Sequence, residues 1–139
     1  MKKLLLPLSL ILFAGICANS QQVLDSNVLL IHNITATVYN ATPSQCDEDY
    51  LHTADGSFID KDDIENLNWI AISRDLEEKG IVMGDVVEII HEDEDICGIY
   101  EVHDRMNSRW TNKIDFLVPD HIKLGKWENI TIKKYQQKR

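Results

Sequence analysis

Two aspartates stand in short stretches of the sequence that otherwise favour burial. Asp104 directly follows the alternating run 98–103, and Asp115 lies inside the apolar run 114–118, eleven positions further along the chain. A carboxyl group that is partly buried in a strand loses hydration, which raises its pKa. A raised pKa makes such a group a usable general acid near neutral pH. A glycosidic bond needs an acid of this kind, because its leaving oxygen must be protonated as the bond breaks.

Plainer roles for the same two residues remain open at this point. Asp104 has Arg105, Arg109 and Lys113 close by in sequence, and an ion pair with one of them would explain its position. Asp115 would be explained equally well as a residue that caps a turn. The chemical interpretation therefore depends on whether both carboxyl groups share one accessible surface.

No local motif points to a different chemistry. The sequence has no phosphate-binding glycine loop, no zinc spacing such as HExxH or paired CxxC, and no GxSxG. The acidic run 91–95 is interpreted as a solvated hairpin tip, because it lacks the spacing and the glycine of a calcium loop. Asp75 is interpreted as a residue that complements a helix dipole. We therefore predict no metal and no cofactor.

The start of the chain has the pattern of a secretory signal peptide at residues 1–20. Two lysines precede an apolar run that ends near Cys17, and small residues follow before Gln21. A lipoprotein anchored through Cys17 is the less favoured alternative, because Ile16 occupies a position where such signals have a small residue. We predict an exported, monomeric protein, periplasmic or extracellular, with no transmembrane segment in the mature chain.

Chain length indicates the number of domains, and net charge limits the class of partner. With 139 residues the chain is expected to form one domain, and its formal net charge is −9. Without the two leader lysines the charge becomes −11, that is −9 minus 2. An acidic surface argues against nucleic acid as the partner, because binding to phosphates requires basic patches.

The remaining sequence predicts a mostly β domain. Residues 21–33 are expected to be a lead-in, residues 41–66 a long loop, and Ser73 the start of a short helix that ends at Gly80. A further helical turn is expected at 119–124. Strand-like runs occupy 34–40, 69–72, 86–90, 98–103, 114–118 and 128–134.

A small closed barrel with one or two short helices satisfies this pattern, because closure removes exposed strand edges. Cys46 and Cys97 remain after the leader is removed. In an exported protein they form either one disulfide or two separate thiols, and the sequence leaves both possibilities open.

Five segments, in order, resemble the motifs of one known family. They are ATVY at 36–39, TADG at 53–56, IAIS at 70–73 with VMGDVV at 82–87, DR at 104–105 with IDF at 114–116, and LG at 124–125 with ITI at 130–132. Over residues 34–135 the chain resembles the RlpA-like and 3D-domain family of six-stranded double-psi β-barrels. That family is related to MltA-type lytic transglycosylases and to expansins.

The resemblance implies a site and a substrate. Asp115 matches the family's acid/base, and Asp104 matches the neighbouring carboxylate that binds substrate and tunes the proton. Contacts with the substrate are implied for four further residues, Thr37, Arg105, Arg109 and Trp110. The Thr37 hydroxyl lines the site, and the indole of Trp110 offers a face to a sugar ring. The two guanidinium groups bind carboxylates of the substrate by charge-assisted hydrogen bonds. The implied partner is peptidoglycan or a related wall glycan.

The implied reaction needs one acid/base and no water. Protonated Asp115 donates to the glycosidic oxygen, and the sugar passes through an oxocarbenium-like state. The carboxylate then takes the proton of the muramyl 6-hydroxyl, which closes a 1,6-anhydro ring. This scheme differs from hydrolysis by two carboxylates.

The sequence departs from the family at two informative positions. Ser73 stands where the family has its first aspartate, and Met106 stands where a glycine follows the DR pair. These departures motivate an alternative, a glycan-binding or wall-loosening module of the expansin kind that does not cleave its ligand. A secreted inhibitor or interaction protein that keeps only the fold is a third reading, because fold alone does not determine function.

Overall fold

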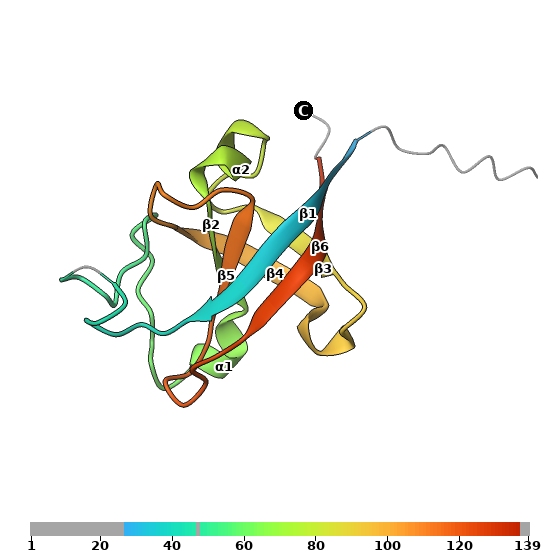
Figure 1. Ribbon diagram of the computed structural model, residues 1–139. Coiled ribbons are helices and arrows are strands. Elements are labelled where there is room, and N and C mark those ends of the chain that lie inside the picture. Colours follow the sequence, from blue (N-terminus) through green and yellow to red (C-terminus); the bar gives the residue numbers. More distant parts are fainter. Residues whose placement is uncertain (1–26, 47, 137–139) are drawn as a thin grey trace, which may run out of the picture.

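The computed structural model describes residues 27–46 and 48–136. Two short helices, α1 (Ile64–Leu67) and α2 (Arg74–Glu78), and one 3₁₀ turn, η1 (Glu94–Ile96), accompany six strands. The strands are β1 (Val28–Tyr39), β2 (Trp69–Ile72), β3 (Val86–Ile90), β4 (Gly98–Arg105), β5 (Lys113–Leu117) and β6 (Lys126–Tyr135). They close into a barrel in the order β1-β5-β2-β4-β3-β6 (Figure 1).

The strand pairing confirms the predicted fold class. β1 runs parallel to β5 and β2 parallel to β4, while the other four neighbouring pairs are antiparallel. Parallel neighbours require crossover connections rather than tight hairpins. The protein is therefore a mostly β, closed six-stranded barrel with two short helices.

The barrel has two hydrophobic cores on opposite sides of β2 and β5. Ile70 and Ile72 belong to the main core in the barrel interior, whereas Ala71 between them belongs to a second cluster outside it. Alternation along a strand explains the separation, because successive side chains point to opposite faces. The second cluster contains Tyr39, Ala41, Ile59, Ile64, Ala71, Met106 and Leu117. The long loop between β1 and β2 contributes to this cluster and packs over the outer face.

Two local features differ from the sequence predictions, and a third decides between two possibilities that the sequence left open. β1 begins at Val28 rather than at residue 34, and Asn33 interrupts its ladder with a left-handed φ of 61° at a bulge. Residues 119–124 form a single turn, closed by the Ile122 N–H and the Pro119 carbonyl, and no helix. The thiols of Cys46 and Cys97 are not bonded to each other.

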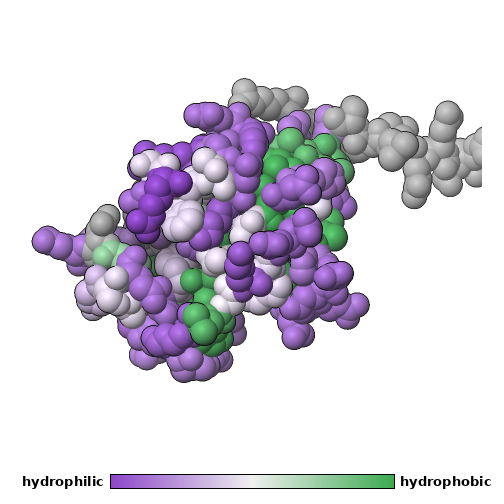
Figure 2. All heavy atoms as spheres, in the orientation of Figure 1, coloured by the Kyte–Doolittle hydropathy of each residue, from purple (hydrophilic) through white to green (hydrophobic). Residues whose placement is uncertain are grey.

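The surface agrees with the acidic composition. The face drawn in Figure 2 is largely hydrophilic. Within the described ranges, no helix has both the length and the apolar character needed to cross a membrane. The predicted signal peptide at 1–20 lies outside the described residues, as do residues 21–26 of the predicted lead-in.

Candidate functional site

The two aspartates lie in one row across four neighbouring strands. Thr37 on β1 is the register partner of Asp115 on β5, and Asp115 is in turn the partner of Ala71 on β2. Ala71 is also the partner of Asp104 on β4. Side chains of register partners point to the same face of a sheet, here the outer face that carries Ala71 and Tyr39. The acids are two strand spacings apart, about 10 Å between Cα atoms.

A β-bulge in β4 produces this alignment. Ile70 pairs with Val102, but the next residue, Ala71, pairs with Asp104, so that His103 is an extra residue in the ladder. A bulge places two residues of one strand opposite one residue of its neighbour and redirects their side chains. Here it leaves His103 and Asp104 beside each other at the outer end of the row.

Asp115 has the environment of a proton donor. Its carboxyl group is half-buried and is hydrogen-bonded to the Thr37 hydroxyl. Burial raises the pKa of Asp115 above its ordinary value, while the Thr37 hydrogen bond and the positive charge of Lys113 work in the opposite direction. The effect of burial is the larger, so Asp115 keeps its proton to a higher pH than an exposed aspartate does.

Asp104 has more donors around it. Its carboxyl accepts hydrogen bonds from the Ala54 N–H at 2.9 Å, from the N–H of the next residue, Arg105, at 2.8 Å, and from the Tyr39 hydroxyl at 3.2 Å. Burial raises the pKa of Asp104 above its ordinary value, and these three hydrogen bonds only partly offset the effect. Since all three donors favour the ionised form, Asp104 is better suited than Asp115 to hold a negative charge beside the substrate.

Tyr39 links the two ends of the row. It is 9% exposed, it packs in the second core, and its hydroxyl reaches from β1 to Asp104 on β4. Burial, followed by the charge of Asp104, raises the pKa of the Tyr39 phenol, so that it remains a hydrogen-bond donor. Its role is packing and the positioning of Asp104, not an open face for a sugar.

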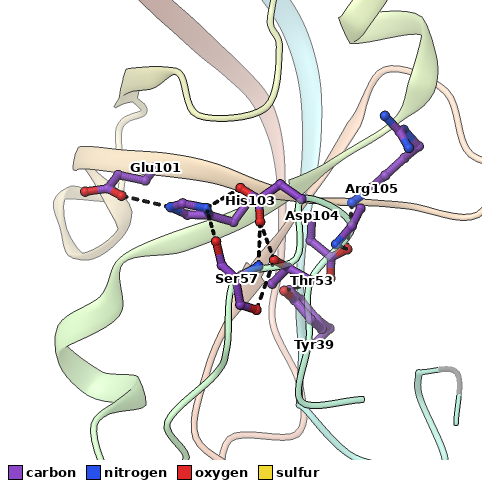
Figure 3. A network of polar contacts seen from close by, with 9 residues as sticks. Tyr39, Thr53, Ser57, Glu101, His103, Asp104 and Arg105 are labelled. Carbon is purple, nitrogen blue, oxygen red and sulfur yellow. Dashed lines mark hydrogen bonds and ion pairs between the residues drawn. The ribbon is translucent and has the colours of Figure 1, made fainter. Parts of the chain in front are cut away.

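A second polar network adjoins Asp104 (Figure 3). His103 Nδ1 lies 2.6 Å from Asp55 Oδ2, and its Nε2 lies 2.8 Å from Glu101 Oε2. Ser57 Oγ is 3.1 Å from the same Nδ1, but both ring nitrogens already face carboxylates. His103 therefore has no free nitrogen with which to activate the serine, and the group is not a Ser-His-Asp triad.

The segment between the two aspartates is fastened to α2. The Arg105 guanidinium forms two hydrogen bonds with Glu77, at 2.9 and 2.6 Å, and so points away from the row. Asp75 accepts the Asn112 N–H with both carboxyl oxygens, at 3.1 and 3.0 Å. This bond gives Asp75 a structural task beyond the helix-dipole role predicted for it.

Ser73 shares in the same attachment. It is fully buried at the N-terminus of α2, where its hydroxyl accepts the Lys113 N–H at 3.0 Å and makes no cap hydrogen bond within the helix. The sequence placed Ser73 correctly at the helix start, but its side chain holds β5 in register. It contributes no acid to the row.

Trp110 and its basic neighbours lie at the other end of the connecting segment. Trp110 is 38% exposed, with Arg109 Cζ 5.0 Å and Lys113 Nζ 3.8 Å from its ring. Lys113 shares the face of Asp115, two residues before it on β5. The row thus has a local positive end on an otherwise acidic protein. The predicted substrate contacts of Arg109 and Trp110 are compatible with this geometry and stay predictions, as does that of Arg105.

No family model matches the sequence, and no curated protein matches it. Among solved structures, the chain is similar to Streptomyces papain inhibitor. The two chains share 19% identity, with a TM-score of 0.50, over 78% of this chain and 96% of that one. At this identity the similarity supports the barrel fold and carries no activity from one protein to the other.

Two further features of the described residues concern sites other than the row. Within residues 27–46 and 48–136, no group of three or more His, Cys, Asp or Glu side chains is placed to hold a metal ion. An apolar pocket of about 390 Å³ at one end of the barrel is lined in part by Tyr100, Phe116 and Trp127. Neither Asp104 nor Asp115 lines it, and the chemistry of the row does not depend on it.

Sequence reasoning missed three contributors to this site. Lys113 was considered only as an ion-pair partner for Asp104, although its position two residues before Asp115 already placed both on one face. The Ala54 N–H lies inside the TADG segment that carried the family resemblance, but no pattern predicts which group a loop amide meets. His103 was missed because, without the bulge, a regular strand would have placed His103 and Asp104 on opposite faces of the sheet.

Replacing Thr37 with valine should raise the pKa of Asp115 further, because the lost hydrogen bond is one that lowers it. A raised folded-state pKa favours the folded protein below the unfolded value, and this contribution is lost as pH rises through the folded value. Carboxyl-detected NMR titration measures the shift. Thr35→Val, two residues earlier on β1 and opposite Lys113, is the control. An unchanged Asp115 pKa in Thr37→Val would refute the assigned hydrogen bond.

Proposed function

We propose that this protein is an exported member of the RlpA-like and 3D-domain barrels and cleaves peptidoglycan glycan strands as a lytic transglycosylase. The observation that carries the proposal is Asp115, a half-buried carboxyl with a raised pKa on the outer face of the barrel. It shares its row with a second carboxyl that has three hydrogen-bond donors. The two acids therefore differ in environment in the way that separate acid and charge-stabilising roles require.

The proposed reaction assigns one proton cycle to Asp115. Its carboxylic acid protonates the glycosidic oxygen as the bond from that oxygen to the sugar C1 breaks. The resulting carboxylate then accepts the proton of the muramyl 6-hydroxyl as that oxygen bonds to C1. Asp115 ends the cycle protonated, and the product carries a 1,6-anhydro ring. Asp104, in its ionised form, favours the positive charge that develops on the sugar between the two steps.

The surroundings of the row fit a glycan that carries carboxylates. Arg109 and Lys113 provide positive charge next to Trp110, whose exposed ring offers an apolar face to a sugar. Muramic acid and its stem peptide supply carboxylates that such groups bind. Arg105 is engaged by Glu77 and would have to leave that pair in order to bind substrate.

The direct test is incubation of the mature protein with purified sacculi, both intact and stripped of stem peptides, followed by mass spectrometry of the soluble products. The expected result is release of fragments with 1,6-anhydromuramyl ends. Products with ordinary reducing ends would indicate hydrolysis instead. If no fragments are released from either substrate, the proposed cleavage is wrong.

One observation favours the alternative of a glycan-binding module without cleavage. Met106, which replaces the family's glycine, is 6% exposed and packs against the second core beside Ala71. Its side chain therefore occupies space on the face that carries the row. Cosedimentation with insoluble wall polymer separates the two functions, since binding without products, retained after substitution of both aspartates, supports the alternative.

A further inference from the structure

The polar network around His103 has no assigned role, although it is in direct contact with the row. Figure 3 shows the imidazole of His103 beside Glu101, which lies on the same strand β4. The other ring nitrogen of His103 faces Asp55, on the loop before β2. From β2, the uncharged ring of Trp69 packs against the imidazole at a centroid distance of 4.2 Å. Asp104, the next residue on β4, is the nearest remaining ionisable group on that strand.

The hydrogen-bond geometry fixes the protonation state of His103. A carboxylate oxygen only accepts hydrogen bonds, and both ring nitrogens have one within 2.8 Å. Both nitrogens must therefore carry a proton, which makes His103 an imidazolium. Burial lowers the pKa of His103, but the hydrogen bonds with Glu101 and Asp55 outweigh it and raise the pKa overall.

Asp55 gathers the loop around this cation. One of its carboxyl oxygens accepts the Thr53 hydroxyl at 2.6 Å and the Ser57 N–H at 3.0 Å, and the other faces His103. Burial raises the pKa of Asp55, but these hydrogen bonds outweigh it and lower the pKa to about 2. The carboxylate consequently remains charged down to a pH of about 2, and the loop 53–57 is held against β4.

The same loop delivers a donor to the row. Ala54, directly before Asp55, donates its N–H to Asp104 at 2.9 Å, and the Asp55 N–H bonds to the His103 carbonyl at 3.3 Å. We propose that Asp55, His103 and Glu101 form a proton-dependent clamp that positions Asp104. While His103 carries two protons the loop is closed and the Ala54 N–H donates to Asp104. Loss of the Nδ1 proton leaves two hydrogen-bond acceptors, the ring nitrogen and Asp55 Oδ2, facing each other, and so releases that donor.

The clamp makes His103 a positioning residue for Asp104. The clamp itself does not depend on any reaction, whereas its effect on cleavage rests on the proposed function. At low pH the donor is in place, and as pH rises through the pKa of His103 the donor is withdrawn. A part of the alkaline decline in cleavage would therefore follow the pKa of His103, in addition to the part set by loss of the proton from Asp115.

The decisive variant is Asp55→Ala, because two explanations predict opposite signs. The charge of Asp55 raises the pKa of Asp104, so that its removal alone would lower that pKa. The hydrogen bond from the Ala54 N–H lowers the pKa of Asp104. Loss of the clamp removes this hydrogen bond and would therefore raise that pKa. We expect a rise, measured by NMR titration of the Asp104 carboxyl. A fall or no change would overturn the proposal.

A second variant keeps the test valid if Asp55→Ala fails to fold. Glu101→Gln removes one charge from the rim of the network and should lower the pKa of His103, because the charge and hydrogen bond of Glu101 raise it. The pH midpoint of the Ala54 amide shift should move down by the same amount. Asp49→Ala, which breaks the exposed His52–Asp49 pair in the same loop, is the matched control and should leave that midpoint unchanged.

Two outcomes contradict the clamp, namely an Ala54 amide that does not titrate with His103, or a midpoint that stays fixed in Glu101→Gln. Both are read without substrate, so an inactive protein does not affect them. If sacculi are cleaved, the alkaline limb of the rate profile should shift with the same variant. A fixed limb together with a shifted Ala54 midpoint would uphold the clamp and refute its part in cleavage.

Discussion

Replacing Asp115 with asparagine should lower the release of anhydro-sugar products from sacculi by about 10²–10⁴-fold, the usual contribution of a general acid/base. The amide has nearly the same shape as the carboxyl but supplies no acidic proton to the leaving oxygen. The fold should be unaffected, because an amide oxygen still accepts the Thr37 hydroxyl. Asp104→Asn should reduce the rate less, because it removes a stabilising charge and leaves the proton donor intact.

The matched control is Asp120→Asn. Asp120 is exposed and pairs with Lys61 at 2.7 Å, outside the row, so this variant removes a charge of the same kind without touching the site. Thermal unfolding of all three variants excludes loss of fold as the cause. If Asp115→Asn releases products at the rate of the unmodified protein, Asp115 is not the acid/base.

Truncating Ile70 to alanine should cost about 2–5 kcal/mol of stability, the range for a fully buried aliphatic residue that leaves a cavity. Ile70 has no exposed surface and lies on β2, which pairs with both acid-bearing strands. For a domain of this size the melting temperature should fall by about 10 °C. Calorimetry or denaturant titration measures the change.

Ile99 provides the comparison on the outside of the barrel. It is 56% exposed, and Ile99→Ala should change stability by no more than about 0.5 kcal/mol. Equal losses at the two positions would mean that the side chain of Ile70 is not in the barrel core. Because Ala71 follows Ile70, loss of packing there should also broaden the NMR signals of the row.

The strands were predictable because their hydrophobic pattern is local. β2 and β3 have the predicted bounds, since each is short and flanked by turn or cap residues that end the pattern. β1 was predicted to begin too late, because Asn33 breaks the alternation at a bulge and the ladder then continues on its N-terminal side. Sequence alternation cannot follow a strand across such a break.

The candidate site was only partly predictable, for a related reason. The resemblance to the barrel family implied a shared role for Asp104 and Asp115, and the pairing of both with Ala71 places them in one row. The contacts of long side chains were harder to predict, because the direction of such a side chain depends on its tertiary partners. Arg105 was predicted to meet a substrate carboxylate, yet the first carboxylate within its reach belongs to Glu77. Helix α2 sets that choice, and its placement is not a local property of the sequence.

The bulge in β4 also has a consequence for how this barrel can change over evolutionary time. The ladder between β2 and β4 would remain in register without His103, because Val102 and Asp104 already pair with successive residues of β2. A single-codon deletion could therefore remove the imidazole and leave Asp104 opposite Ala71. Control by protons would then be separable from the acid pair, and could be lost in one genetic step while the barrel itself stays closed.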